Sequence, residues 1–157
     1  MPAFAGLGGE FGHFPLPAGP MIAHGLPVLP CGCGRAGCSE TLLSAPGLAR
    51  IAAHVTGRNL TPEAIVEGRR ADASLQKAWD IWLELASEFL ITLCFTIDPA
   101  VIVIGGGLSN ARGLVEDVSR HTASGDTERL FHSPDQAGAR RRCQRCARRG
   151  FCCMEQE

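Results

Sequence analysis

A cluster of cysteines and glycines near the start of the chain constrains its fold more than any other feature. Three cysteines follow the spacing C-x-C-x4-C over residues 31–38, with glycines between them, and a histidine stands upstream at position 13. Three thiolates and one imidazole supply the closed tetrahedral set that a structural Zn²⁺ prefers. Glycines let a short loop turn tightly enough for the thiolates to converge. We therefore predict a structural zinc loop over residues 13–38, with the ligands His13, Cys31, Cys33 and Cys38; unpaired cysteines in a glycine-rich turn are the alternative.

The number and clustering of the cysteines bear on the cellular compartment of the protein. The chain has 157 residues, enough for one domain with a core, and eight cysteines. In a secreted protein that number would suggest a disulfide framework. Residues 1–9 lack the basic start and the apolar segment of a signal peptide. We therefore expect a cytoplasmic protein whose clustered cysteines bind metal. The apolar run over residues 89–104 is interrupted by Asp98-Pro99, so no membrane-spanning helix is expected.

The charge is low overall but concentrated at the C-terminal end. The formal net charge is −1, which argues against nucleic-acid binding as the main role. Six arginines lie between residues 140 and 149, interleaved with cysteines. A second zinc knuckle or an RNA-binding tail would explain this pattern. Because residues 133–157 lack apolar periodicity, we prefer a disordered or non-native tail after a folded unit over residues 1–132.

Three segments have the apolar spacing of helices. Each follows a side chain that can cap a helix, and a proline opens the first turn of two of them. We expect these helices over residues 44–57, 61–68 and 72–97, after an irregular, proline-rich connection over residues 14–30. In the longest helix, the two tryptophans belong to an apolar stripe that predicts core packing. Cys94 is interpreted there as a small buried hydrophobic residue.

A strand and a glycine turn follow the longest helix. The β-branched run at residues 100–104 is typical of a strand buried on both faces. Gly105-Gly106-Gly107 comes next, and a further helix is expected over residues 113–120. Helix, strand, turn and helix in this order predict an α/β architecture with a parallel sheet. Such a glycine turn lets backbone N–H groups approach a nucleotide, although a tight structural turn explains it equally well.

Three motifs together resemble the ROK family of sugar kinases, and within it the bacterial N-acetylglucosamine kinases. They read GEFGH at residues 9–13, CGCGRAGCSE at residues 31–40 and DPAVIVIGGGLS at residues 98–109. The resemblance covers about residues 5–112. It implies an α/β fold that is part of an actin-like ATPase (ribonuclease H-like) structure, namely its C-terminal lobe. Relatives are often dimers, so a homodimer is also expected.

The resemblance also implies functions for individual residues. The four metal ligands would hold zinc, Glu10 and Glu40 would bind the sugar, and His13 would contact the sugar as well. Gly105, Gly106 and Gly107 would lie against the nucleotide. The implied reaction transfers a phosphoryl group from Mg-ATP to the 6-hydroxyl of N-acetylglucosamine or another hexose. The alternative explanation for Glu40 is an acid at a helix N-terminus, stabilised by the macrodipole.

The sequence departs from the family pattern before residue 10. The family's catalytic aspartate and its first phosphate loop, Asp-x-Gly-x-Thr, have no counterpart here. Because phosphoryl transfer depends on positioning and charge stabilisation, we expect an incomplete chain with no catalytic residue of its own and little activity alone. A sugar-sensing ROK transcriptional regulator and a stand-alone zinc-binding module are the alternatives.

Overall fold

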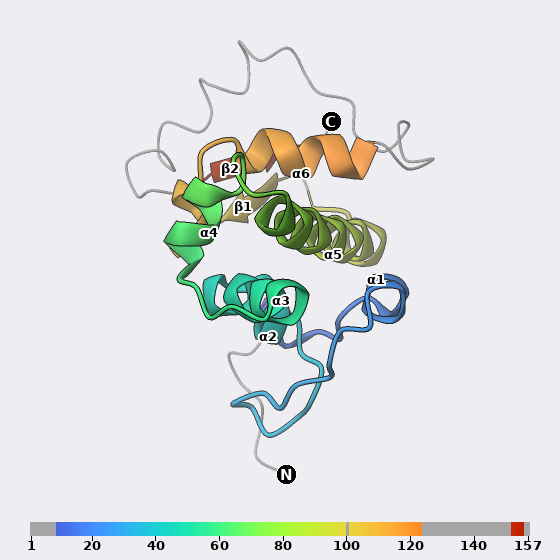
Figure 1. Ribbon diagram of the computed structural model, residues 1–157. Coiled ribbons are helices and arrows are strands. Elements are labelled where there is room, and N and C mark those ends of the chain that lie inside the picture. The colour runs from blue at the N-terminus through green and yellow to red at the C-terminus, as the bar shows by residue number, and fades with distance from the viewer. Residues whose placement is uncertain (1–8, 100, 124–151, 156–157) are drawn as a thin grey trace.

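The structure is a computed structural model that describes residues 9–99, 101–123 and 152–155 (Figure 1). The helices in this part of the chain, in order, are η1 (Phe11–His13), α1 (Ala18–Ala23), α2 (Glu40–Leu43), α3 (Ala45–Thr56), α4 (Pro62–Gly68), α5 (Ala73–Ile97), η2 (Gly107–Asn110) and α6 (Leu114–Ala123). The strands are β1 (Val101–Ile104) and β2 (Cys152–Glu155).

Helix α5 is the centre of the fold. It runs between α3 on one side and α6 on the other (Figure 1), and it also contacts α1, α2 and α4. Eleven of its residues are buried. Trp79 and Trp82 are among them and stack with ring centroids 5.4 Å apart. The predicted core stripe is therefore confirmed, whereas Cys94, expected to be buried, is only half-buried.

The three helices expected from capping signals are present. Ser44, Thr61 and Asp72 precede α3, α4 and α5, and each side chain accepts a backbone N–H of the first turn, at 3.2, 3.2 and 2.9 Å. Gly57 ends α3 with φ 71°, a conformation that favours glycine. Local capping chemistry therefore defined these boundaries correctly.

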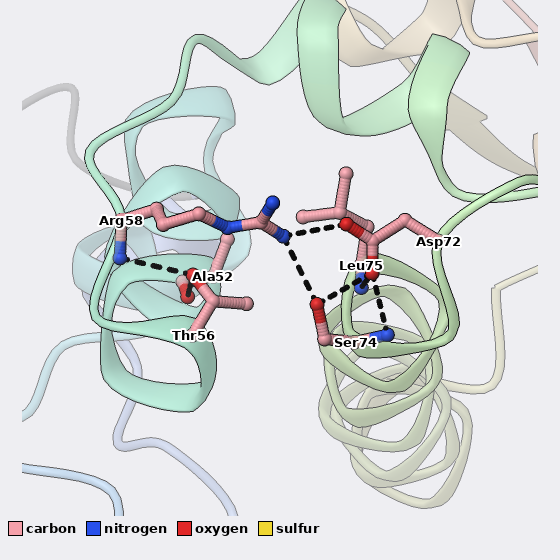
Figure 2. Close-up of polar contacts among 6 residues, drawn as sticks. All are labelled: Ala52, Thr56, Arg58, Asp72, Ser74 and Leu75. Atoms are coloured by element: carbon pink, nitrogen blue, oxygen red, sulfur yellow. Dashed lines mark hydrogen bonds and ion pairs between the residues drawn. The ribbon is translucent and has the colours of Figure 1, made fainter.

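A polar network ties the end of α3 to the start of α5 (Figure 2). Arg58 Nη2 donates to Asp72 Oδ2 at 2.7 Å and to Ser74 Oγ at 3.0 Å. The Ser74 hydroxyl donates to Asp72 Oδ1 at 2.6 Å. The Ser74 hydroxyl and the Arg58 guanidinium hold the pKa of Asp72 well below its usual range. One carboxylate thus caps α5 and binds it to Arg58, two residues after the end of α3.

The connection over residues 14–30 is more regular than predicted. It contains α1, in which Pro20 and Met21 are buried. The prolines misled the prediction because the first N–H groups of a helix have no intrahelical partner, so a proline near its start costs little.

The sheet differs from the prediction. The expected strand is present as β1, but it pairs antiparallel with β2, and the described residues contain no parallel pairing. Val101 and Val103 are 41% and 45% exposed, so the strand is not buried on both faces there. A β-branched run indicates an extended backbone, but its partners come from distant segments. Most of the predicted disordered or non-native tail, residues 133–157, lies outside the described residues, and β2 is the part of it that is described.

The long helix does not qualify as a membrane span. Among the described residues, no helix combines the length and apolar character needed to cross a bilayer.

Candidate functional site

The four predicted metal ligands converge in the structure. His13 ends η1, and the three cysteines lie on the loop between α1 and α2. One nitrogen or sulfur atom from each of the four residues lies within 4.8 Å of the others. His13 Nδ1 is 3.6 Å from Cys31 Sγ, and Cys33 Sγ is 3.6 Å from Cys38 Sγ. No other cluster of this kind is found in the part of the chain that the structure describes.

The backbone of the loop shapes this cluster. Cys31 N donates to Arg35 O at 2.7 Å, and Gly34 N donates back to Cys31 O at 3.0 Å. Gly34 and Gly37 have φ of 87° and 73°, which side chains with a Cβ rarely adopt. The predicted use of glycine to fold the loop is confirmed at these two positions.

Two of the distances between ligand atoms fit a tetrahedral zinc ion, and the four atoms together lie within 4.8 Å of one another. Zn–S bonds of about 2.3 Å and Zn–N bonds of about 2.0–2.1 Å place neighbouring ligand atoms about 3.6–3.8 Å apart. Both short contacts in the cluster have such lengths, at 3.6 Å. Three sulfurs and one ring nitrogen are also the donor set that zinc favours.

Hydrogen bonding and burial shift the pKa values of two cysteines in opposite directions. Hydrogen bonds from the backbone and the side chain of Arg35 lower the pKa of Cys33 to about 6. Burial raises the pKa of Cys38 to about 11. Arg35 also donates to the carbonyl oxygen of His13, so it connects the cysteine loop to η1. Sequence reasoning missed this arginine, although its place between two cysteines was a usable signal.

Of the three predicted sugar-binding residues, two lie together. Glu40 Oε2 is 3.9 Å from His13 Nδ1. Ser39 N and Oγ both donate to Phe14 O at 2.8 Å, which holds the start of α2 against the end of η1. Glu40 is the first residue of α2, as expected if it is simply an acid stabilised at a helix N-terminus. However, α2 has only four residues and therefore a weak dipole.

A cavity of about 400 Å³ opens beside the metal cluster. His13 and Glu40 line it, together with the cysteines at 31 and 33 and with Arg50 of α3. Glu10 is exposed and is not among the lining residues. Arg50, whose Nη1 donates to Thr41 O at 2.7 Å, carried no signal in the sequence because exposed arginines on helices are common.

A second cavity, of about 380 Å³, lies between α4 and η2. Of the three predicted nucleotide-binding glycines, Gly107 lines it, whereas Gly105 and Gly106 do not. Gly106 has φ 87°, so the turn after β1 requires a glycine there. Arg69 also lines this cavity, and no motif in the sequence pointed to it.

The comparison with protein families decides the assignment. The model of the ROK family matches residues 3–153. The chain belongs to the ROK family. This ROK chain is 33% identical to "N-acetylgalactosamine kinase AgaK" of Shewanella sp. (strain ANA-3), over 74% of the chain and 38% of that relative. It is 40% identical to "N-acetyl-D-glucosamine kinase" of Escherichia fergusonii, over 65% of the chain and 35% of that relative. The chain thus spans less than two-fifths of the length of these relatives.

A solved structure supports the fold assignment. The ROK hexokinase from Thermus thermophilus matches with a TM-score of 0.59 and 30% identity, over 74% of this ROK chain and 38% of the hexokinase. The likeness to this hexokinase confirms the prediction of an actin-like ATPase fold. The described residues themselves are mostly helical, with little sheet. The family match extends beyond residues 5–112, where the resemblance of the motifs ended.

Proposed function

We propose that this ROK chain forms the zinc-loop part of an ATP-dependent kinase that phosphorylates an N-acetylhexosamine at its 6-hydroxyl, with N-acetylglucosamine favoured. The observation that carries the proposal is the convergence of His13 with the three cysteines, beside Glu40 and an open cavity. The names of the two sequence relatives, one an N-acetylgalactosamine kinase and the other an N-acetyl-D-glucosamine kinase, support an N-acetylated amino sugar.

In this proposal, His13, Cys31, Cys33 and Cys38 would hold zinc. A bound zinc would supply rigidity rather than reactivity, because four protein ligands leave no open coordination position. The loop would keep the imidazole of His13 and the carboxylate of Glu40 in a constant orientation at the cavity.

The polar side chains at the first cavity suit a sugar. A carboxylate accepts hydrogen bonds from the hydroxyl groups of a sugar, and Glu40 and His13 face the same space. Glu10 is assigned to the sugar by motif alone, since the cavity that the structure forms does not include it.

The second cavity is the proposed nucleotide site. Gly107 lines it at the start of η2, and Gly105 and Gly106 lead into it from β1. Chemistry at such a site is mainly positioning of the phosphates and stabilisation of charge. Mg-ATP is the proposed co-substrate.

Sugar binding by the zinc-loaded chain tests this proposal. Calorimetric titration should detect N-acetylglucosamine, N-acetylgalactosamine, or both, in preference to fructose. Glu40→Gln should weaken the affinity about tenfold, since a hydrogen bond to a charged acceptor is worth about 1.5–3 kcal/mol.

Glu88→Gln is the matched control for that variant. Glu88 is exposed on α5 and lines neither cavity, so the affinity should not change. Equal sugar affinity in Glu40→Gln and in the unmodified chain would contradict the proposed sugar site.

A further inference from the structure

Cys33 and Cys38 differ in exposure although their sulfur atoms are neighbours. Cys33 is exposed and lines the first cavity, whereas Cys38 is only 2% exposed. The two Sγ atoms lie 3.6 Å apart. Cys31, the third cysteine of the loop, also lines the cavity but is half-buried. A small oxidant would therefore meet Cys33 first, with the sulfur of Cys38 directly beside it.

Bound zinc would keep both sulfurs in their reactive form. The thiolate, not the thiol, is the nucleophile, and a thiol that coordinates a metal ion is deprotonated outright. Arg35 places a positive charge at the exposed sulfur, because its backbone and its side chain both hydrogen-bond Cys33. Exposure, thiolate character and a second cysteine nearby are the features of cysteines that are oxidised selectively.

The loop between the two cysteines has room for the movement that a disulfide requires. The sulfurs must approach from 3.6 Å to a bond length of about 2.05 Å, which is a shift of about 1.5 Å. Gly34 and Gly37 lie between them, and a Cβ on Gly34 would meet no atom within 4 Å. The sulfurs can therefore approach through a small rearrangement of an open loop.

We propose that Cys33 and Cys38 are a site of oxidation by peroxide, at which a disulfide forms and the zinc ion is released. The Cys33 thiolate attacks one oxygen of hydrogen peroxide, the O–O bond breaks, hydroxide leaves, and Cys33 becomes a sulfenic acid. The Cys38 thiolate then attacks Cys33 Sγ, the S–S bond forms, and a second hydroxide leaves. Two electrons pass from the sulfurs to the peroxide, and Zn²⁺ keeps its oxidation state.

The disulfide would leave zinc with His13 and Cys31, half of the set that a structural site needs. Residues at the proposed sugar site are attached to the lost ligand. Glu40 stands two positions after Cys38, and the Cys38 carbonyl oxygen accepts from Thr41 N at 2.9 Å and from Thr41 Oγ1 at 2.7 Å. Oxidation should therefore also weaken sugar binding. This inference rests on the proposed function, because it assumes that the loop holds zinc beside the sugar site.

Peptide mapping of the zinc-loaded full chain tests the inference. The chain is treated with hydrogen peroxide, released zinc is measured with a chromogenic indicator, remaining thiols are blocked, and the chain is digested with trypsin without reduction. Arg35 lies between the two cysteines, so Cys33 falls in the peptide 1–35 and Cys38 in the peptide 36–50. These peptides should be joined by a disulfide, and fragmentation on either side of Gly32 should assign the bond to Cys33.

The same digest contains its own control. Cys94 lies on α5 outside the metal cluster, in the peptide 78–112, and should still carry the thiol block at the peroxide dose that links the first two peptides. Cross-linking should release one zinc ion for each disulfide formed, and a dithiol reductant with added zinc should reverse both changes.

The outcomes separate the inference from the proposed function. If the purified chain cannot be loaded with zinc, the proposed zinc loop is wrong, and the inference fails with it. If the chain holds zinc but the two peptides stay unlinked, or the bond joins Cys31 to Cys38, only the inference fails. Oxidation of Cys94 at the same dose, or retention of zinc by the cross-linked loop, would also overturn it.

A second experiment measures the effect on the sugar site. The reduced, zinc-loaded chain and the oxidised chain are each titrated with N-acetylglucosamine. The dissociation constant should rise about tenfold on oxidation, the loss expected when the hydrogen bond to Glu40 is broken. If the reduced chain binds no sugar, the proposed sugar site is wrong. Equal affinity in the reduced and oxidised chains would overturn the inferred control of sugar binding.

Discussion

At the residue scale, the convergence of His13 with Cys31, Cys33 and Cys38 is the part of the candidate site that the sequence predicted best. Cysteines and histidines at short spacing have few explanations other than metal binding. The structure brings all four ligand atoms within 4.8 Å of one another. Arg35 and Arg69 were missed. Arginines are common in sequences. These two are distinguished by their contacts with residues that are distant in the sequence. Only a folded structure shows such contacts.

The first prediction concerns the buried ligand Cys38. Cys38→Ser should lower the affinity for zinc at least about a hundredfold, because the variant loses one of the thiolates on which a structural zinc site depends. Competition with a chromogenic chelator measures this constant. Cys94→Ser is the control, since Cys94 lies on α5 outside the cluster, and its zinc affinity should match that of the unmodified chain.

The second prediction concerns the pH dependence of the Asp72 network. The pKa of Asp72 is depressed in the folded chain, so its contribution to stability is complete above the pKa of about 3.9 in the unfolded chain. That contribution is lost as the pH falls through the folded pKa. The stability difference between the unmodified chain and Asp72→Asn should therefore be constant from pH 6 to 8 and shrink below about pH 4.

Thermal melts followed by circular dichroism measure that difference. Asp80→Asn is a suitable control, because Asp80 is exposed on the same helix and accepts only from Gln76 among the described contacts. A stability difference for Asp72→Asn that stays constant down to pH 3 would contradict the role given to this carboxylate.

At the scale of elements, helices with capping signals were predictable, and the pairing of strands was not. A cap such as Ser44 acts within one turn, so the sequence alone contains the information. Pairing joins β1 to a strand some fifty residues away, and no local pattern specifies that partner or its direction. Helix α1 was missed for a related reason, because its stability comes from burying Pro20 and Met21.

The third prediction concerns the junction of α2 and α3. A Cβ at Gly47 would lie 2.3 Å from the backbone of Leu42. Movement of side chains alone could not relieve this clash, because the neighbouring atoms belong to the backbone. Gly47→Ala should therefore destabilise the chain by about 3 kcal/mol. The junction also positions Glu40, so sugar affinity should fall as well.

Urea denaturation measures the stability change, and a matched glycine provides the control. A Cβ at Gly19 of α1 would meet no atom within 4 Å, so Gly19→Ala should leave stability nearly unchanged. If both variants were equally stable, α2 and α3 would not be in the close contact described here.

At the scale of the whole molecule, the zinc loop and the helical core are connected but distinct. The loop is attached to the core through α2, whose Leu42 is fully buried against it. Because zinc would bind the folded loop more tightly than the unfolded chain, its removal should lower the midpoint of thermal unfolding. The core around Trp79 does not contact the metal ligands through any described hydrogen bond, so the helices should survive chelation.

The fourth prediction follows from that arrangement. Treatment with a strong chelator should lower the melting midpoint by about 5 °C or more while leaving most of the helical circular dichroism at 20 °C, and added zinc should restore the midpoint. Complete loss of helix on chelation would show instead that the core depends on the metal.

The proposed function depends on one zinc ion bound by His13, Cys31, Cys33 and Cys38 beside the proposed sugar cavity. X-ray absorption spectroscopy at the zinc edge of the purified chain tests it most directly. We expect one equivalent of zinc with three sulfur ligands at about 2.3 Å and one nitrogen ligand at about 2.0–2.1 Å. A chain that binds no zinc, or a zinc ion coordinated mainly by oxygen, would contradict it.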